Sequence, residues 1–248
     1  MRFTTKTAAM ILSICGMGLG ATGLASADAA PTDLHDALAQ DGVTAAELEA
    51  VGRWEPEAGD AIAFTVLRKG KPFGRHEVRF DEADDGALLV STDVSLRAGM
   101  GPITVYRYTL DSAETWRDGQ LVGLAGDLKV EGRTGRVEAA AEGDTLVVDG
   151  TEFSGTVPLG ILPSSHWNVL QTQAEQLVST EDGEIIEVVM SQVGREMIEA
   201  GGESIEATRY LMGSDIDVDL WYDDEGRWVK LAFEVRDQSI EYVLDRLY

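Results

Sequence analysis

The sequence predicts a mainly β protein, built as a single strongly curved, half-closed antiparallel sheet of about ten to twelve strands with one inserted helix and short N-terminal helices. Apolar and polar residues alternate with period two along most of the chain, as strands with one buried and one solvated face require. Glycine occurs at nearly every break in this alternation, and only one stretch changes to helical spacing. A flat open sheet rarely exceeds about 10 strands, so strong curvature or partial closure is expected.

Residues 1–27 have the features of a secretory signal peptide. Arg2 and Lys6 precede an apolar run over 8–24, and the small residues Ala25, Ser26 and Ala27 follow it as a cleavage site. We therefore predict cleavage near Ala27 and a periplasmic or secreted mature protein. No later stretch is long and apolar enough to span a bilayer, so no integral span is expected in the mature chain.

The single cysteine, Cys15, offers an alternative in which the chain is a lipoprotein. The large Ile14 just before it and the short apolar run ahead of it both argue against lipidation. If residues 1–27 are removed, the mature chain has no cysteine, which excludes disulfide and thiol chemistry.

The chain is strongly acidic, with a formal net charge of −24 at pH 7. Such a charge repels nucleic acid and anionic membrane surfaces, so neither is an expected partner. A cationic partner or a divalent cation remains compatible with it. The simplest interpretation is a well-solvated acidic surface, because net charge reports on solubility more than on function.

Residues 28–57 are predicted to form a helical arm or linker. Thr44 and Glu47 have capping-box spacing, and Asp33 can cap an earlier turn. The apolar stripe of these helices is thin. The remaining residues, 58–248, are predicted to form a single antiparallel β domain with a helical insertion over 158–178.

Alternation and turn residues place the strands in chain order. The first hairpin joins Ile62, Phe64 and Val66 to His76, Val78 and Phe80 across Gly70. Further alternating runs are separated by Asp-Gly and Glu-Gly turns. They lie at 88–96, 103–110, 121–130, 136–141, 145–148, 184–193, 195–199 and 204–212.

The insertion departs from this pattern. Trp167, Leu170, Ala174 and Leu177 recur at three- and four-residue spacing after Ser164 and Ser165, either of which can cap a helix. A lone helix among strands is expected to cover the open face of a curved sheet.

The C-terminal segment 215–248 predicts a three-stranded meander. Its first strand alternates Ile216, Val218 and Leu220 with Asp215, Asp217 and Asp219. In the second strand Trp228 is out of phase with Val229, Leu231 and Phe233, so a regular strand would direct it to the opposite face.

Common catalytic patterns are missing from the sequence. It has no nucleophile elbow, no H-E-x-x-H pair and no phosphate-binding loop. His76 is interpreted as part of a strand surface, and His166 as a solvated residue beside a helix cap, because adjacent helical residues do not face each other. No catalytic residue and no cofactor is therefore predicted.

Two candidate binding sites remain. The first is a divalent-cation site at Asp215, Asp217, Asp219 and Asp223, although Leu220 and Gly226 stand where a calcium-binding EF-hand loop needs glycine and glutamate. The second is an apolar-ligand site formed by aromatic side chains, which suit such a pocket as well as a core. Its candidate residues are Trp167, Trp228, Tyr106, Tyr108 and Tyr210.

Three motifs carry a family resemblance. They are RYLMGSDIDVDLWYDDEGRWVKLAFEVRDQSIEYVL from Arg209, the sequence SHWN at 165–168, and E-x-W-x-x-G-x-L at 114–121. They resemble an uncharacterised family of exported bacterial proteins, a domain of unknown function. The resemblance implies a curved antiparallel β-sheet, similar in outline to periplasmic lipoprotein carriers. It implies no activity and no catalytic residues.

The leading functional hypothesis is an exported, non-enzymatic β-scaffold that binds a lipid-like or other apolar molecule on its concave face. One alternative is an envelope protein–protein interaction module that uses its acidic surface and has no small-molecule pocket. Another is a hydrolase whose catalytic residues are too scattered to recognise. The sequence indicates neither the ligand nor the oligomeric state.

Overall fold

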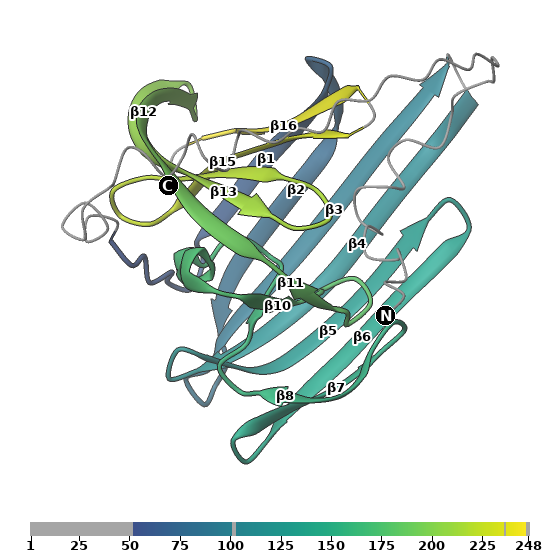
Figure 1. Cartoon of the computed structure of the whole chain (residues 1–248), viewed down its shortest axis with the longest axis vertical. Helices are drawn as coiled ribbons and strands as arrows, with labels where there is room; N and C mark the ends of the chain where they lie inside the picture. The colour runs from purple at the N-terminus through teal and green to yellow at the C-terminus, as the bar shows by residue number, and fades with distance from the viewer. Residues whose placement is uncertain (1–51, 101–102, 236, 247–248) are drawn as a thin grey trace, which may run out of the picture.

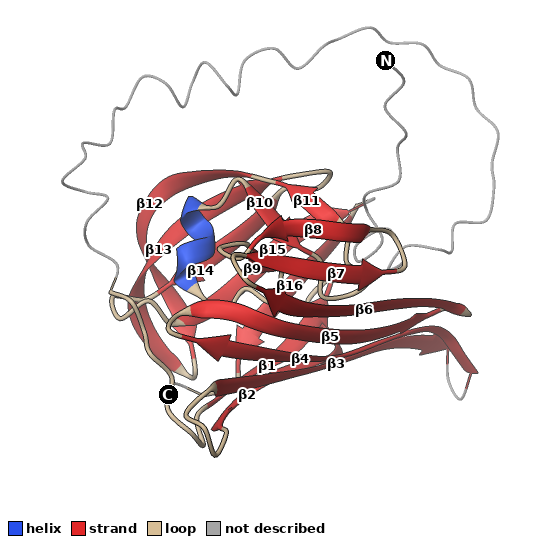
Figure 2. Ribbon diagram, turned by 90° about the horizontal axis from the view of Figure 1, so that it is seen from below, coloured by secondary structure: helices blue, strands red, loops and turns tan. Residues whose placement is uncertain are grey.

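The computed structural model describes residues 52–100, 103–235 and 237–246. These residues form a mainly β structure whose only described helix is a short 3-10 turn, η2 (Val169–Gln173) (Figure 1 and Figure 2). Segment 1–27 and both predicted N-terminal helices lie outside the described residues. The strands are β1 (Ala61–Arg68), β2 (Lys71–Glu82), β3 (Leu88–Met100), β4 (Ile103–Arg117), β5 (Gln120–Val130), β6 (Arg133–Glu142), β7 (Thr145–Gly150), β8 (Ser154–Pro158), β9 (Leu162–Pro163), β10 (Gln176–Val178), β11 (Ile185–Glu187), β12 (Val189–Ala200), β13 (Glu203–Gly213), β14 (Val218–Tyr222), β15 (Trp228–Val235) and β16 (Gln238–Leu244).

Thirteen strands form one antiparallel sheet in the order β12-β13-β14-β15-β16-β1-β2-β3-β4-β5-β6-β7-β8. Strands β1 to β8 form one meander and β12 to β16 a second. The two meanders join where β16 pairs with β1, with Phe64 opposite Leu244. Strands β8 and β12 are the free ends of this order, so the sheet is not closed.

The predicted count of ten to twelve strands was too low. Strand β8 reads SGTVP, and its glycine and proline made it resemble a loop. At β12, by contrast, the prediction gave two strands where the structure has one. A bulge between Gln192 and Gly194 interrupts its pairing with β13 and shifts the phase of the alternation, which made it look like two runs.

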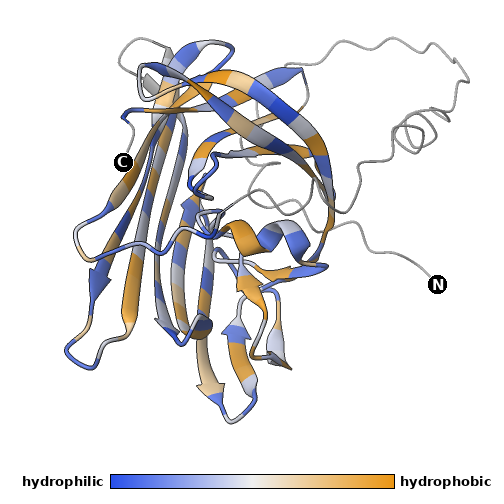
Figure 3. Cartoon of the chain, turned by 90° about the vertical axis from the view of Figure 1, so that its left-hand side faces the viewer, coloured by the Kyte–Doolittle hydropathy of each residue, from blue (hydrophilic) through white to orange (hydrophobic). Residues whose placement is uncertain are grey.

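The core lies on the inner face of the sheet, as the alternation predicted. Ile62, Phe64 and Val66 of β1 are fully buried, while the residues between them are partly exposed. Figure 3 shows the resulting bands of apolar and polar residues on neighbouring strands. Burial of each large apolar side chain stabilises the fold by about 1.5–3 kcal/mol.

The prediction of an inserted α-helix was wrong. Between β8 and β12 the chain forms a second, three-stranded sheet in the order β11-β10-β9, with the turn η2 inside it. Asn168, rather than a serine, caps η2 by accepting the backbone N–H of Leu170 at 3.1 Å. Leu177, predicted as the end of the helix, lies in β10 and pairs with Leu162 and Ile186. Tertiary pairing therefore overrides the helical spacing.

The insertion rests directly on glycines of the large sheet. A Cβ atom at Gly126 of β5 would lie 2.0 Å from the carbonyl oxygen of Thr180. At Gly150 of β7 it would lie 2.3 Å from the carbonyl oxygen of Asp182, and Val137 lies between these two glycines in the sheet register. These positions lack side chains because backbone packs on backbone there. The contact fixes the position of 180–182 across β5 to β7.

Residues 52–57, the described end of the predicted arm, contact the sheet. The backbone N–H of Gly52 donates to the carbonyl oxygen of Asp224 at 2.7 Å. Trp54 packs edge-on against Phe80 with ring centroids 5.1 Å apart. Over the described part of the chain, no helix is both long and apolar enough to cross a membrane.

Candidate functional site

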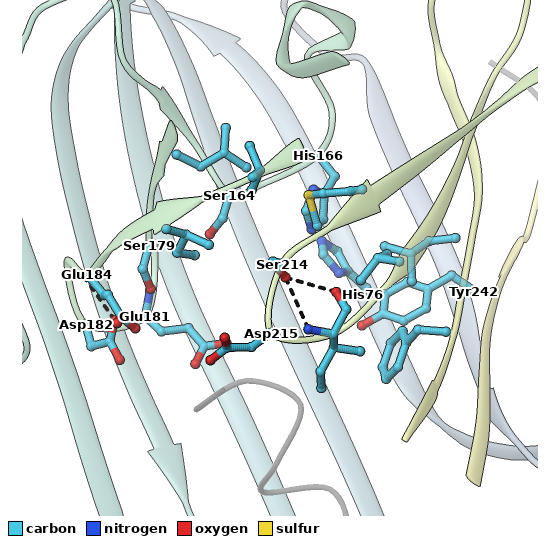
Figure 4. A pocket seen from close by; sticks show the side chains of 18 residues that line it. His76, Ser164, His166, Ser179, Glu181, Asp182, Glu184, Ser214, Asp215 and Tyr242 are labelled. Carbon is cyan, nitrogen blue, oxygen red and sulfur yellow. Dashed lines mark hydrogen bonds between the residues drawn. The ribbon is translucent and has the colours of Figure 1, made fainter. Parts of the chain in front are cut away.

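A cavity of about 90 Å³ lies between the insertion and the inner face of the sheet. Figure 4 shows His76, His166 and Tyr242 on one side of it and Glu181, Asp182 and Glu184 on the other. Its apolar wall consists of Leu177, Ile186, Val188, Met212, Ile216, Val218, Leu231 and Phe233. The strands β2, β13, β15 and β16 and the insertion thus all contribute to one cavity.

His76 is the least satisfied polar side chain in this cavity. It is only 3% exposed, and neither ring nitrogen has a hydrogen-bond partner among the described residues. The rings of Trp228 and Tyr242 lie edge-on to it at 5.3 and 5.6 Å. Burial, assisted by nearby His166, lowers its pKa to about 3, so the ring is neutral. The interpretation of His76 as a surface residue was wrong.

Glu181 lines the same cavity from the insertion. The hydroxyl of Tyr108 donates to its Oε1 at 2.7 Å, and the carboxyl group is buried. Burial raises the pKa of Glu181 to about 8, a rise that the Tyr108 hydrogen bond opposes. The carboxyl group is therefore largely protonated at pH 7. Tyr108, predicted to contact a ligand directly, reaches the cavity through Glu181.

His166 is buried, so the prediction of a solvated histidine was also wrong. Its backbone has a φ of 65°, which is uncommon for a residue other than glycine. The Tyr222 hydroxyl donates to its carbonyl oxygen at 2.7 Å, and the Gln171 amide donates to the same oxygen at 3.1 Å. Gln171 also bonds to ring Nδ1 at 3.0 Å. These contacts hold His166 in place and attach η2 to β14.

A buried carboxylate joins two of the motifs that carry the family resemblance. Oε2 of Glu114 accepts hydrogen bonds from the indole N–H groups of Trp116 at 2.8 Å and Trp167 at 3.0 Å. The two indole rings meet edge to face at 5.3 Å. Burial raises the pKa of Glu114, and the hydrogen bond from Trp167 is the largest of the effects that lower it. This network fixes the start of the insertion on β4, close to one end of the cavity.

Trp228 points inward, against the prediction that it faces away from the core. It is fully buried and packs against Phe64 and the ring of His166. A bulge sets Trp228 opposite Tyr222 and leaves Val229 as the extra residue. The bulge reverses the phase of the strand, which the simple alternation rule does not anticipate.

The other predicted aromatic residues lie in the core around the cavity. Trp167 is buried against Phe80 and Trp116. Tyr106 stacks on Phe73, and Tyr210 packs edge-on against Tyr222. The structure thus places Trp228 against the ring of His166, keeps Tyr106 and Tyr210 in separate aromatic pairs, and puts none of the five predicted aromatic residues in the described lining of the cavity.

The four candidate metal ligands are not gathered into one site. Asp215 and Asp217 are exposed in the loop before β14, because the strand starts only at Val218 and not at Asp215 as predicted. Asp219 forms a two-point ion pair with Arg209 at 2.8 and 2.9 Å. Within the described ranges, no three histidine, aspartate, glutamate or cysteine side chains are grouped to hold a metal ion.

Asp223 instead stabilises the turn between β14 and β15. Its carboxylate accepts the backbone N–H of Arg227 at 2.9 Å and the Arg227 side chain at 2.6 Å. The backbone N–H of Glu225 donates to it as well. Of the four aspartates, only Asp215 borders the cavity.

The serine hydroxyls of the cavity bond to the backbone of its wall. The hydroxyl of Ser164 accepts the backbone N–H of Thr180, and that of Ser179 accepts the backbone N–H of Glu181. Ser214 donates to the carbonyl oxygen of Ile216. These hydroxyls support the backbone of the cavity wall rather than either histidine. A neutral imidazole, a protonated carboxyl group and an apolar wall can recognise an uncharged ligand.

Sequence reasoning missed His76, Glu181 and Tyr242 as cavity residues. One signal was present for His76, since it alternates in phase with the apolar Val78 and Phe80 and therefore had to face inward. Glu181 gives no such signal, because its burial depends on the insertion packing on distant glycines.

Comparison with known proteins agrees with this architecture. A crystal structure described as a beta-barrel-like protein of domain of unknown function DUF1849 from Brucella abortus is similar, with a TM-score of 0.53 at 10% sequence identity. The match covers 75% of this chain and 95% of that one. No curated protein matches the chain. A family model matches residues 64–245, and the chain accordingly belongs to the family described as domain of unknown function DUF6134.

Proposed function

We propose that this protein is a non-enzymatic β-scaffold that binds an apolar small molecule in the cavity between the insertion and the sheet. The observation that carries the proposal is the cavity wall, where apolar side chains from β13, β14, β15 and the insertion face one partly open space. Sites for small molecules are typically concave, mostly apolar and provided with a few polar groups. His76 and Glu181 would be those polar groups.

The dimensions of the cavity favour a slender ligand. Its volume of about 90 Å³ is below the ~300–1,000 Å³ of sites for drug-sized ligands. A volume of this size holds one end of an alkyl chain or of a similarly narrow group, and the rest of such a ligand would extend through the open side of the cavity. Exposed Asp215 and half-buried Glu184 mark the side from which such a chain would enter.

The proposed location of this function is outside the cytoplasm, which the signal-peptide pattern of residues 1–27 supports. In the periplasm or a secreted fluid, an apolar molecule needs a soluble protein to shield it from water. The large negative charge supports solubility there.

A cavity-filling substitution tests the proposal. Val188 is buried in the cavity wall, so Val188→Phe should occupy the space that a ligand needs. Exposed Val193 of β12 provides the matched control, Val193→Phe. The slender hydrocarbon probe diphenylhexatriene should fluoresce with the wild type and with V193F, and its affinity should fall at least tenfold with V188F.

Two results would refute the proposal. One is no binding of the probe by a folded wild-type sample. The other is equal binding by V188F and V193F, since the probe would then occupy another surface. A second variant at the entrance, Ile216→Trp, should also weaken binding without adding volume inside the core.

A further inference from the structure

We propose that the ligand carries an uncharged hydroxyl group that hydrogen-bonds to His76, and that the cavity discriminates against carboxylates. The ligand class is then a long-chain alcohol or a comparable hydroxylated apolar molecule. This inference rests on the proposed function and specifies it.

The first argument is the unmet hydrogen-bonding capacity of His76. Both ring nitrogens are buried without a partner in the described structure, although buried polar side chains are nearly always hydrogen-bonded. Leaving such groups unpaired destabilises a folded protein. A ligand group that bonds to one ring nitrogen removes part of this penalty, so binding is favoured by more than apolar contact alone.

The second argument is the chemistry that a neutral ring can recognise. The lowered pKa keeps His76 uncharged, with one N–H donor and one nitrogen acceptor. A hydroxyl can donate to that nitrogen or accept from that N–H, so it can hydrogen-bond to either tautomer of His76. A carboxylate can only accept, and its charge would have to be buried against a ring that is neutral in the unliganded site.

The third argument is the charge of the remaining lining. Glu181, Asp182, Glu184 and Asp215 border the cavity, and neither lysine nor arginine is among its described lining residues. An anionic head group would therefore meet acidic side chains other than the protonated Glu181 along its path, without any cation to pair with. An uncharged hydroxyl avoids this repulsion and leaves the alkyl chain against Leu231 and Phe233.

The experiment compares two ligands with the same chain, 1-decanol and decanoate, as competitors for diphenylhexatriene on the full mature protein. Decanol should displace the probe at concentrations at least tenfold lower than decanoate does. Equal potency, or better displacement by decanoate, would overturn the inference while leaving the proposed function intact. Failure of the probe itself to bind would instead refute the proposed function.

Variants of His76 identify the group responsible. His76→Phe retains an aromatic ring of similar size but has no hydrogen-bonding nitrogen. It should reduce the affinity for 1-decanol about tenfold, as expected for a lost hydrogen bond in a desolvated site, and thereby remove most of the preference for decanol over decanoate. His76→Gln restores a donor and an acceptor, so it should recover most of the preference for decanol over decanoate.

A stability measurement separates this role from a purely structural one. Without ligand, H76F should melt at the same temperature as the wild type or a higher one, because it removes an unpaired buried polar group. A lower melting temperature together with unchanged decanol affinity would show that His76 serves only the core, and the inference would fail. If H76F does not fold, equal potency of decanol and decanoate on the wild type still overturns the inference, and H76Q takes the place of H76F in the stability measurement.

Discussion

Substitution of Gly126 by alanine should detach the insertion from the large sheet. The added Cβ atom would lie 2.0 Å from the carbonyl oxygen of Thr180, whereas such contacts are essentially never closer than 3.0 Å. Segment 180–182 must therefore move away by about 1 Å or β5 must bend, since backbone stands on both sides of the contact. Overpacking of this kind costs about 1–3 kcal/mol.

The same strand offers a matched control in Gly123→Ala. There the added Cβ atom would meet the side chain of Thr115 at 3.4 Å, which is an ordinary contact. Replacing a strand glycine by alanine at such a position should be neutral or stabilise the fold by up to about 1 kcal/mol. With about 2–4 °C per kcal/mol for a chain of this size, G126A should melt about 2–12 °C below the wild type.

Thermal unfolding and amide hydrogen exchange provide the assay. In G126A, exchange should accelerate over 176–188, while strands β1 to β3 keep their protection. The reasoning is refuted if G126A and G123A have equal melting temperatures and equal exchange over 176–188. The insertion would then not depend on backbone contact with β5.

Two further predictions concern buried carboxyl groups. The pKa of Glu181 is raised to about 8 in the fold, so between pH 5 and 8 the folded state holds a proton that the unfolded state has lost. The free energy of unfolding of the wild type relative to that of Glu181→Gln should therefore fall as the pH rises from 5 to 8, by at most about 1.4 kcal/mol per pH unit. Urea unfolding of both proteins at pH 5 and pH 8 checks this. A difference in stability between the two proteins that is the same at both pH values would contradict it. Glu114→Ala should lower stability by about 2–5 kcal/mol because it leaves two indole N–H groups buried without their acceptor. Glu138→Ala, at an exposed position, is the control and should change the free energy of unfolding by less than about 0.5 kcal/mol in the same urea experiment. An equal loss of stability in the Glu114 and Glu138 variants would argue against the Glu114 network.

The regular hairpins were predictable because their pattern is local. The alternation of Ile62, Phe64 and Val66 with partly exposed neighbours directly reflects one buried face. The Asp118-Gly119 turn likewise has positive φ at both residues, as a two-residue hairpin turn requires. Such features depend on a few consecutive residues and need no knowledge of the rest of the fold.

The failures share a different cause. The bulges near Gly194 and Val229 shift the phase of the alternation within a single strand. The alternation alone therefore indicated two strands in place of β12 and an outward-facing Trp228. The insertion has helical spacing, yet its pairing and the contact of Thr180 with Gly126 come from residues far apart in the chain. The cavity depends on that packing, which explains why Glu181 was not identified.

The most direct test of the account is a crystal structure of the mature protein with 1-decanol. The account predicts that the alkyl chain lies in the cavity along Leu231 and Phe233, with its hydroxyl within hydrogen-bonding distance of a ring nitrogen of His76. Decanol bound only outside this cavity, or a cavity that stays without decanol under saturating conditions, would contradict it.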